Sequence, residues 1–438
     1  MISGVAAGFG SAGLLYSLTW ATTSRMSHPW LLWLLPVAGL GVGLLRRVAG
    51  RATAGTNLLL EDFHAPADAP ADVQGNGPED APGDWCLVDD RVSGLRRRNS
   101  DRVSQIGHRT GVPAGLAPYV LVGSVITHLF GGSGGREGAA VQIAAGLTAP
   151  VRPLLERLGN RTAMATVDVR RMLVVAALAG GFGSVFGVPW AGMIFGVEVA
   201  RHWEMSGSHL RLRWDETAAF LPTAAVASFV GHLVTTHLGI HHLAGPRVKS
   251  PQLFSAVPGL LIVALSAGVL ARAYLVAHRL VVLSFRRSTL PRLLWPVLGG
   301  ALVVAGTAAI GTRAYLGLSL PLVNAALTGV GVASTAFILK LAFTAVTLGS
   351  GFPGGEVTPL LCMGACLGAT LAGPLGEPAG LLAAVGMVAT WAAASNTPIS
   401  AAAMGAELFG PIGLLAFLPA NMIATALSGR HGVYHSQG

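Results

Sequence analysis

The sequence predicts an all-α polytopic membrane protein, and three observations support that fold class. Hydrophobic residues make up 52% of the 438 residues, charged residues only 11%, and the mean hydropathy is +0.60. Soluble domains carry about 25% charged residues, so this chain lacks the charge to cover a water-facing surface. Apolar segments recur along the chain, and glycine- or proline-rich breaks interrupt several of them. Most of the surface is therefore expected to face lipid.

The apolar segments set the expected order of helices. A helix needs about 20 apolar residues to span a bilayer, and several segments reach that length. The first has no basic leader or small-residue cleavage site, so we expect it to be retained as a membrane helix. The segments lie at about 1–22, 29–45, 113–131, 172–200, 218–238, 252–282, 291–313, 322–349, 357–372, 378–395 and 397–427.

One strongly polar region, residues 66–112, separates the first two segments from the rest. It is rich in Pro, Gly, Asp and Arg, which favours a solvent-exposed loop over a folded domain. The net charge of +9 comes from arginine, because Lys249 and Lys340 are the only lysines. Arginines near membrane helices mark cytoplasmic loops, and no DNA- or RNA-binding pattern accompanies them, so nucleic acid is not an expected partner.

The two halves of the chain repeat the same pattern. "PWAGMIFGVE" (189–198) and "PISAAAMGAE" (398–407) both place Gly seven residues and Glu nine residues after a proline. A glycine-rich break precedes each one. Matched interruptions in two halves indicate a transporter repeat whose site lies near the middle of the membrane. The expected divisions are 1–65 with the first break, the loop 66–112, 113–245 completing the first repeat, and 246–438 as the second.

Three breaks open short helices: "GTNLLLE" (55–61), "GGREG" (134–138) and "GGEVTP" (354–359). Irregular backbone at membrane depth occurs only where protein or water satisfies it. A helix that starts there presents free N–H groups and the positive end of its dipole, which together bind anions. Three such helices converging on one point predict a site for a halide or an oxyanion.

Glu137 lies at the start of the helix that follows the second break. A carboxylate there can occupy the anion site when ionised and leave it when protonated, which makes it a candidate gate and proton carrier. The alternative is an ordinary acid at a helix N-terminus, stabilising by up to about 1 kcal/mol. Because acids inside the membrane are costly, we favour the functional interpretation.

These residues also carry a family resemblance. "GREGAAVQI", "GVPWAGMIFGVE" and "GGEVTPL" resemble the signature stretches of the CLC family of chloride channels and chloride/proton antiporters, over about residues 50–438. "GTNLLLEDFH", "GSGFPGGEVTPL", "NTPISAAAMGAELFG" and the terminal "GVYHSQ" are most similar to its fluoride/proton antiporter branch. The resemblance implies a CLC-type inverted-repeat transporter fold with broken and re-entrant helices, assembled as a homodimer with one pathway per subunit.

The resemblance also implies roles for individual residues. Glu137 is then the gating glutamate, and Glu356 and Thr358 form the polar pair that carries protons inward. Val199 stands where chloride/proton antiporters have a further carboxylate, and Glu198 before it is expected to be structural. The expected anion-binding residues are Thr56, Asn57, Gly135, Arg136, Val357 and Tyr434.

The sequence therefore predicts a fluoride/proton antiporter, with no cofactor and no metal site, in the cytoplasmic membrane of a bacterium. A chloride channel or chloride/proton antiporter is the alternative within the class. A membrane enzyme that uses Glu137 and Glu356 as an acid/base pair is the alternative outside it. No nucleophile or metal-ligand set accompanies either acid in the sequence, so an enzyme is not expected.

Overall fold

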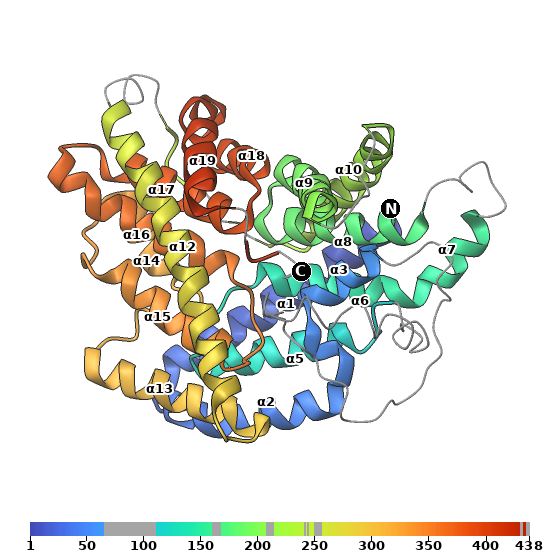
Figure 1. Cartoon of the computed structure of the whole chain (residues 1–438), viewed down its shortest axis with the longest axis horizontal. Coiled ribbons are helices and arrows are strands. Elements are labelled where there is room, and N and C mark those ends of the chain that lie inside the picture. The colour runs from blue at the N-terminus through green and yellow to red at the C-terminus, as the bar shows by residue number, and fades with distance from the viewer. Residues whose placement is uncertain are drawn as a thin grey trace, which may run out of the picture.

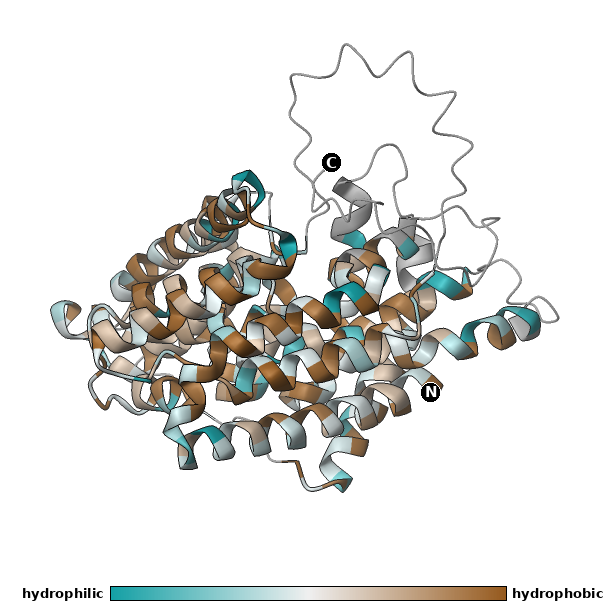
Figure 2. Ribbon diagram, turned by 90° about the horizontal axis from the view of Figure 1, so that it is seen from below, coloured by the Kyte–Doolittle hydropathy of each residue, from teal (hydrophilic) through white to brown (hydrophobic). Residues whose placement is uncertain are grey.

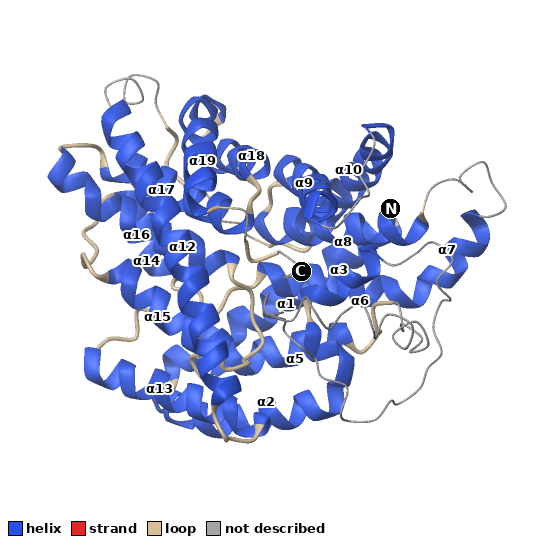
Figure 3. Ribbon diagram, viewed as in Figure 1, coloured by secondary structure: helices blue, strands red, loops and turns tan. Residues whose placement is uncertain are grey.

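The computed structural model describes residues 1–64, 111–159, 168–206, 214–240, 242, 245–248, 256–429 and 432–434. In these ranges every regular element is a helix and no strand occurs (Figure 3). By length and composition, seven described helical stretches are able to cross a membrane. Hydrophobic residues run along the helices throughout (Figure 2). The expected all-α membrane fold is confirmed, whereas all but the last two residues of the predicted loop 66–112 lie outside the description.

The first half of the chain supplies the helices drawn from blue to green in Figure 1. They are α1 (Ile2–Ser27), α2 (Leu35–Ala49), α3 (Thr56–His64), α5 (Leu116–Leu129), α6 (Glu137–Thr148), α7 (Arg152–Gly159), α8 (Val169–Phe186), α9 (Pro189–Ser206) and α10 (Trp214–His237).

The second half supplies the yellow-to-red helices. They are α12 (Val257–Arg287), α13 (Trp295–Ile310), α14 (Leu320–Thr328), α15 (Ala336–Gly349), α16 (Val357–Leu375), α17 (Ala379–Ser395), α18 (Pro398–Phe409) and α19 (Leu414–Ser428).

Three long apolar segments each contain two helices. In the segment 172–200, Gly187 closes α8 with a left-handed φ of 73°, and Pro189 opens α9. A glycine past the end of a helix and a proline at the start of the next are the usual signals for such a corner. The segments 322–349 and 397–427 divide in the same way, into α14 with α15 and α18 with α19.

The matching segments found in the sequence form helices at matching intervals along the chain. α5 begins at residue 116 and α15 at residue 336, which is 220 residues later, and α6 and α16 begin at residues 137 and 357, the same interval. The prolines that open α9 and α18 are 209 residues apart. The chain is thus built from two structural repeats.

Glu198 and Glu407 join the repeats by reciprocal contacts. The Glu198 carboxylate accepts the N–H groups of Ile399 and Ser400, at 3.0 and 2.8 Å, in the first turn of α18. The Glu407 carboxylate accepts those of Trp190 and Ala191, at 3.1 and 2.8 Å, in the first turn of α9. Each glutamate therefore satisfies the free N–H groups at the start of the other repeat's helix.

Replacing Glu407 with Ala is expected to destabilise the protein by about 0.5–2 kcal/mol, the usual cost of losing a helix N-terminal acceptor. The Trp190 and Ala191 N–H groups would then lack an acceptor. Thermal unfolding in detergent measures this, and Glu198→Ala is expected to give a similar loss because its contacts are equivalent. A Glu407→Ala protein as stable as the wild type would show that water replaces the carboxylate without cost.

α8 and α17 contribute many of the buried core residues. Both helices are buried along most of their length, as expected for helices that are apolar all round. Phe182 on α8 stacks on Trp391 of α17, with ring centroids 5.0 Å apart, and on Phe195 of α9, at 4.5 Å. This aromatic cluster packs beside the site described below.

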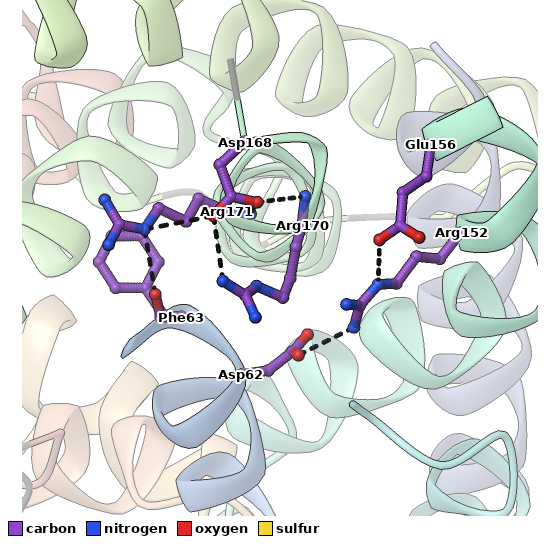
Figure 4. Close-up of polar contacts among 7 residues, drawn as sticks. All are labelled: Asp62, Phe63, Arg152, Glu156, Asp168, Arg170 and Arg171. Atoms are coloured by element: carbon purple, nitrogen blue, oxygen red, sulfur yellow. Dashed lines mark hydrogen bonds and ion pairs between the residues drawn. The ribbon is translucent and has the colours of Figure 1, made fainter. Parts of the chain in front are cut away.

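A polar network fixes the carboxyl end of α3 against α7 and α8 (Figure 4). Arg152 donates to Asp62 at 2.9 Å and to Glu156 at 2.6 Å. Arg171 donates to the Phe63 carbonyl at 3.2 Å, and its guanidinium lies 5.4 Å from the centre of the Phe63 ring. The network holds α3 in place, and with it the helix start that follows the first break. Its members are Asp62, Phe63, Arg152, Glu156, Asp168, Arg170 and Arg171.

Candidate functional site

The second and third breaks are paired backbone to backbone. The N–H of Gly135 donates to the Gly355 carbonyl at 2.6 Å, and the N–H of Gly355 donates to the Gly135 carbonyl at 2.8 Å. A Cβ on Gly135 would come within 2.9 Å of the Gly355 oxygen, and one on Gly355 within 2.9 Å of the Gly138 nitrogen. Glycine is needed at both positions because of this close approach. Because the Gly135 N–H already donates to the Gly355 carbonyl, Gly135 shapes the site in this structure and does not offer that N–H to an anion.

Two threonines extend the pairing symmetrically. The Thr127 hydroxyl, near the end of α5, donates to the Pro353 carbonyl at 2.8 Å. The Thr347 hydroxyl, near the end of α15, accepts the N–H of Ser133 at 3.1 Å. Each break is therefore held by the helix that precedes the other break, and α6 and α16 start side by side.

Glu137 is 1% exposed and lies across the start of the neighbouring repeat. Its Oε2 accepts the Thr358 N–H at 3.0 Å and the Arg136 N–H at 3.1 Å, and the Thr358 hydroxyl donates to its Oε1. The Arg136 guanidinium lies 3.5 Å from the same carboxylate. Glu137 therefore occupies the donor groups that the sequence predicted for an anion.

Helix dipoles add to this attraction. The first N–H groups of α6 and α16 have no partner within their helices, and Val357 is the first residue of α16. A negative charge between the two helix starts is stabilised by both positive ends. The arrangement can exchange a carboxylate for a small anion without burying an unpaired charge.

Glu356 faces a different environment from Glu137. Its side chain is 23% exposed, and its Oε1 lies 3.9 Å from Nδ1 of His278 on α12. The sequence suggested that Thr358 would hydrogen-bond to Glu356, but the Thr358 hydroxyl donates to Glu137. At the start of α16, Thr358 therefore faces Glu137, whereas Glu356 faces His278 on a more exposed side.

The first break contributes the start of α3. Thr56 is its first residue, and the Thr56 hydroxyl accepts a hydrogen bond from Gln142 of α6 at 2.9 Å. This bond places the start of α3 beside the helix that Glu137 opens. Asn57 follows on α3, but its side chain lies outside the described part of the structure.

Tyr434 lies in a turn after α19. Its ring packs edge-on against Phe195, with centroids 5.6 Å apart. The N–H of Val433 donates to the Ala394 carbonyl at 2.8 Å and anchors the turn to α17. Tyr434 is close enough to Glu137 and Glu356 to interact with both charges. The structure thus brings Tyr434 to the same region as the two acids.

Two buried basic side chains border the second break. Lys340 is fully buried, and its ammonium donates to Ser133 Oγ at 2.9 Å and to the carbonyls of Tyr315 and Gly317 at 3.2 and 2.6 Å. His128, also buried, contacts the Gly134 carbonyl at 3.2 Å. The signal in the sequence that identifies both positions is a basic residue inside an apolar segment. Their contacts show that both side chains brace the break.

Comparisons with known proteins show which proteins this chain is similar to. Residues 99–429 match the family model of voltage gated chloride channels. A chloride/fluoride channel protein of Pseudomonas syringae pv. tomato is 34% identical, over 98% of this chain and 83% of its own length. The H(+)/Cl(-) exchange transporter ClcA of Vibrio cholerae is 26% identical, over 62% of this chain and 59% of its own length. The crystal structure of a CLC-type fluoride/proton antiporter superposes with a TM-score of 0.77 at 26% identity, covering 99% of this chain and 95% of that one.

Proposed function

Because the chain belongs to the voltage-gated chloride channel (CLC) family of anion channels and transporters, we propose that it exports fluoride across the membrane in exchange for protons. The observation that carries the proposal is the position of Glu137, whose buried carboxylate lies on the Thr358 donors between two helix starts. The chloride/fluoride channel protein and the fluoride/proton antiporter described above support the choice of anion.

The proposed cycle follows from the charge on Glu137. The ionised carboxylate is attracted by the N-termini of α6 and α16 and by Arg136. Protonation removes that charge, so the side chain leaves and an anion takes the donors it had occupied. When the anion departs, the acid loses its proton and returns. One carboxylate thereby links anion movement to proton movement.

Fluoride fits this site because it is small and strongly hydrated, so a binding site must offer several hydrogen-bond donors in place of water. In the proposal these donors come from the Thr358 N–H and hydroxyl, the N–H groups at the break, and the hydroxyls of Thr56 and Tyr434. The larger, less hydrated chloride gains less from the same donors.

Fluoride transport is therefore expected to exceed chloride transport at equal gradients. The measurement is efflux from liposomes containing the purified protein, followed with fluoride- and chloride-selective electrodes, with empty liposomes as the control. Equal rates for the two anions would contradict the fluoride assignment and place the protein with the chloride transporters of the family.

The proposal includes a homodimer in the cytoplasmic membrane of a bacterium. Glu137 and its donors come from a single chain, so each subunit has its own pathway. An apolar groove between α9, α18 and α19 offers the surface for the second copy, since its lining is almost entirely hydrophobic. The groove is lined by Trp190, Ile194, Ile399, Ala402, Ala403, Ala406, Glu407, Pro411, Leu414 and Leu418.

A further inference from the structure

His278 connects the inner acid to a more exposed position. Its side chain is 29% exposed and its Nδ1 lies 3.9 Å from Glu356, which is itself 23% exposed. Glu137, in contrast, is 1% exposed. Glu356 and His278 are thus both partly exposed whereas Glu137 is buried, as expected along a route that leads a proton from a buried acid to water.

Tyr274 fixes the orientation of the imidazole. It precedes His278 by one turn of α12, is fully buried, and stacks on the imidazole with ring centroids 6.0 Å apart and an interplanar angle of 8°. The stacking restrains the ring, whose Nδ1 faces Glu356. Two titratable side chains, Tyr274 and Glu356, contact His278.

The distribution of arginine shows which side this route faces. The last turn of α2 carries Arg46 and Arg47, and the last turn of α12 carries Arg286 and Arg287. The Arg46 guanidinium also lies against the break that precedes α16. Because an excess of arginine near the ends of membrane helices is typical of the cytoplasmic side, we assign this break to the cytoplasmic side as part of the proposal.

From this geometry we propose that His278 passes protons between Glu356 and cytoplasmic water. An imidazole gains and loses protons near neutral pH, as a relay requires. Protonated Glu356 gives its proton to Nδ1, and the imidazolium then releases its other proton from Nε2 to water. The 3.9 Å separation exceeds a direct hydrogen bond, so one water molecule or a small rotation of the ring bridges it. The inference rests on the proposed fluoride/proton exchange.

The test replaces His278 with Gln, which keeps polarity and approximate size but cannot titrate. Fluoride efflux from liposomes is followed with an electrode, and a proton ionophore keeps the pH equal on both sides. Efflux is expected to fall by about 100-fold or more, the lower end of the range for losing a proton-transfer group. Imidazole added at equal concentration on both sides is expected to restore much of the rate. The matched control is His237→Gln, which changes an exposed histidine in the last turn of α10 and is expected to behave as the wild type with and without imidazole.

Glu356→Gln, assayed in parallel, separates this inference from the proposed function. If Glu356→Gln is inactive but His278→Gln transports at the wild-type rate, the relay is wrong and the exchange mechanism stands. A slow His278→Gln protein that imidazole does not rescue would show that His278 only supports the structure, which also overturns the relay. If Glu356→Gln itself transports normally, Glu356 carries no proton. Both the proposed proton path and the relay are then wrong.

Discussion

Glu137→Gln is expected to abolish proton coupling and to impair anion turnover. Glutamine cannot ionise, so it carries no proton between the two sides. Its amide oxygen can accept one of the hydrogen bonds that Thr358 and Arg136 donate to the carboxylate, but it has no charge for the helix starts to attract. The measurement is proton uptake into liposomes driven by a fluoride gradient, with fluoride efflux recorded on the same samples.

The matched control for this variant is Glu377→Gln. Glu377 lies just beyond the carboxyl end of α16, far along the helix from the site. It is expected to leave both fluxes unchanged. A Glu137→Gln protein that still pumps protons in response to an anion gradient would show that another group is the carrier.

Glu356→Gln is expected to give a folded protein that transports little or no fluoride. An ordinary acid at the start of α16 would contribute at most about 1 kcal/mol to stability, and its loss would leave transport intact. A proton relay must instead change its ionisation state in every cycle, and Gln cannot. Fluoride efflux measures the loss, and an unchanged elution volume and melting temperature in detergent verify the fold. Normal fluoride/proton exchange in this variant would remove Glu356 from the pathway, and Val199 has no carboxylate with which to replace it.

Thr358→Ala, a companion to Glu356→Gln, is expected to weaken transport without destroying the fold. The ionised Glu137 would lose the Thr358 hydroxyl, and a hydrogen bond to a charged group contributes about 1.5–3 kcal/mol. The Thr358 N–H would remain as a donor. Thr358→Ser, which retains the hydroxyl, is therefore expected to restore most of the rate.

Features that depend on local sequence were predictable. Apolar length and glycine or proline punctuation predicted the helices, the three breaks and the two repeats. Glu137 stood out because an acid beside glycines within an apolar stretch has few structural explanations. Only the division of long apolar segments into two helices required the structure, since Gly187 and similar corner residues also occur inside packed membrane helices.

Contacts between the repeats were not predictable from the sequence. Thr358 is two residues from Glu356 but 221 from Glu137. A prediction from the local sequence therefore pairs Thr358 with Glu356, the nearer acid. His278 lies near the carboxyl end of an apolar segment, and no sequence pattern relates it to Glu356. Such contacts depend on how helices far apart in the chain cross, which neither periodicity nor spacing encodes.

The reciprocal contacts of Glu198 and Glu407 have a consequence for biosynthesis. When the ribosome has released only the first half of the chain, Glu198 has no α18 to accept from, and the start of α9 has no Glu407. The Gly135 N–H likewise lacks its acceptor, the Gly355 carbonyl, until the second half is made. Unsatisfied polar groups are costly in lipid, so a half-length chain is poorly protected there and exposed to quality-control proteases. We therefore expect the native fold to form only after the second half has been translated, when both sets of hydrogen bonds can form.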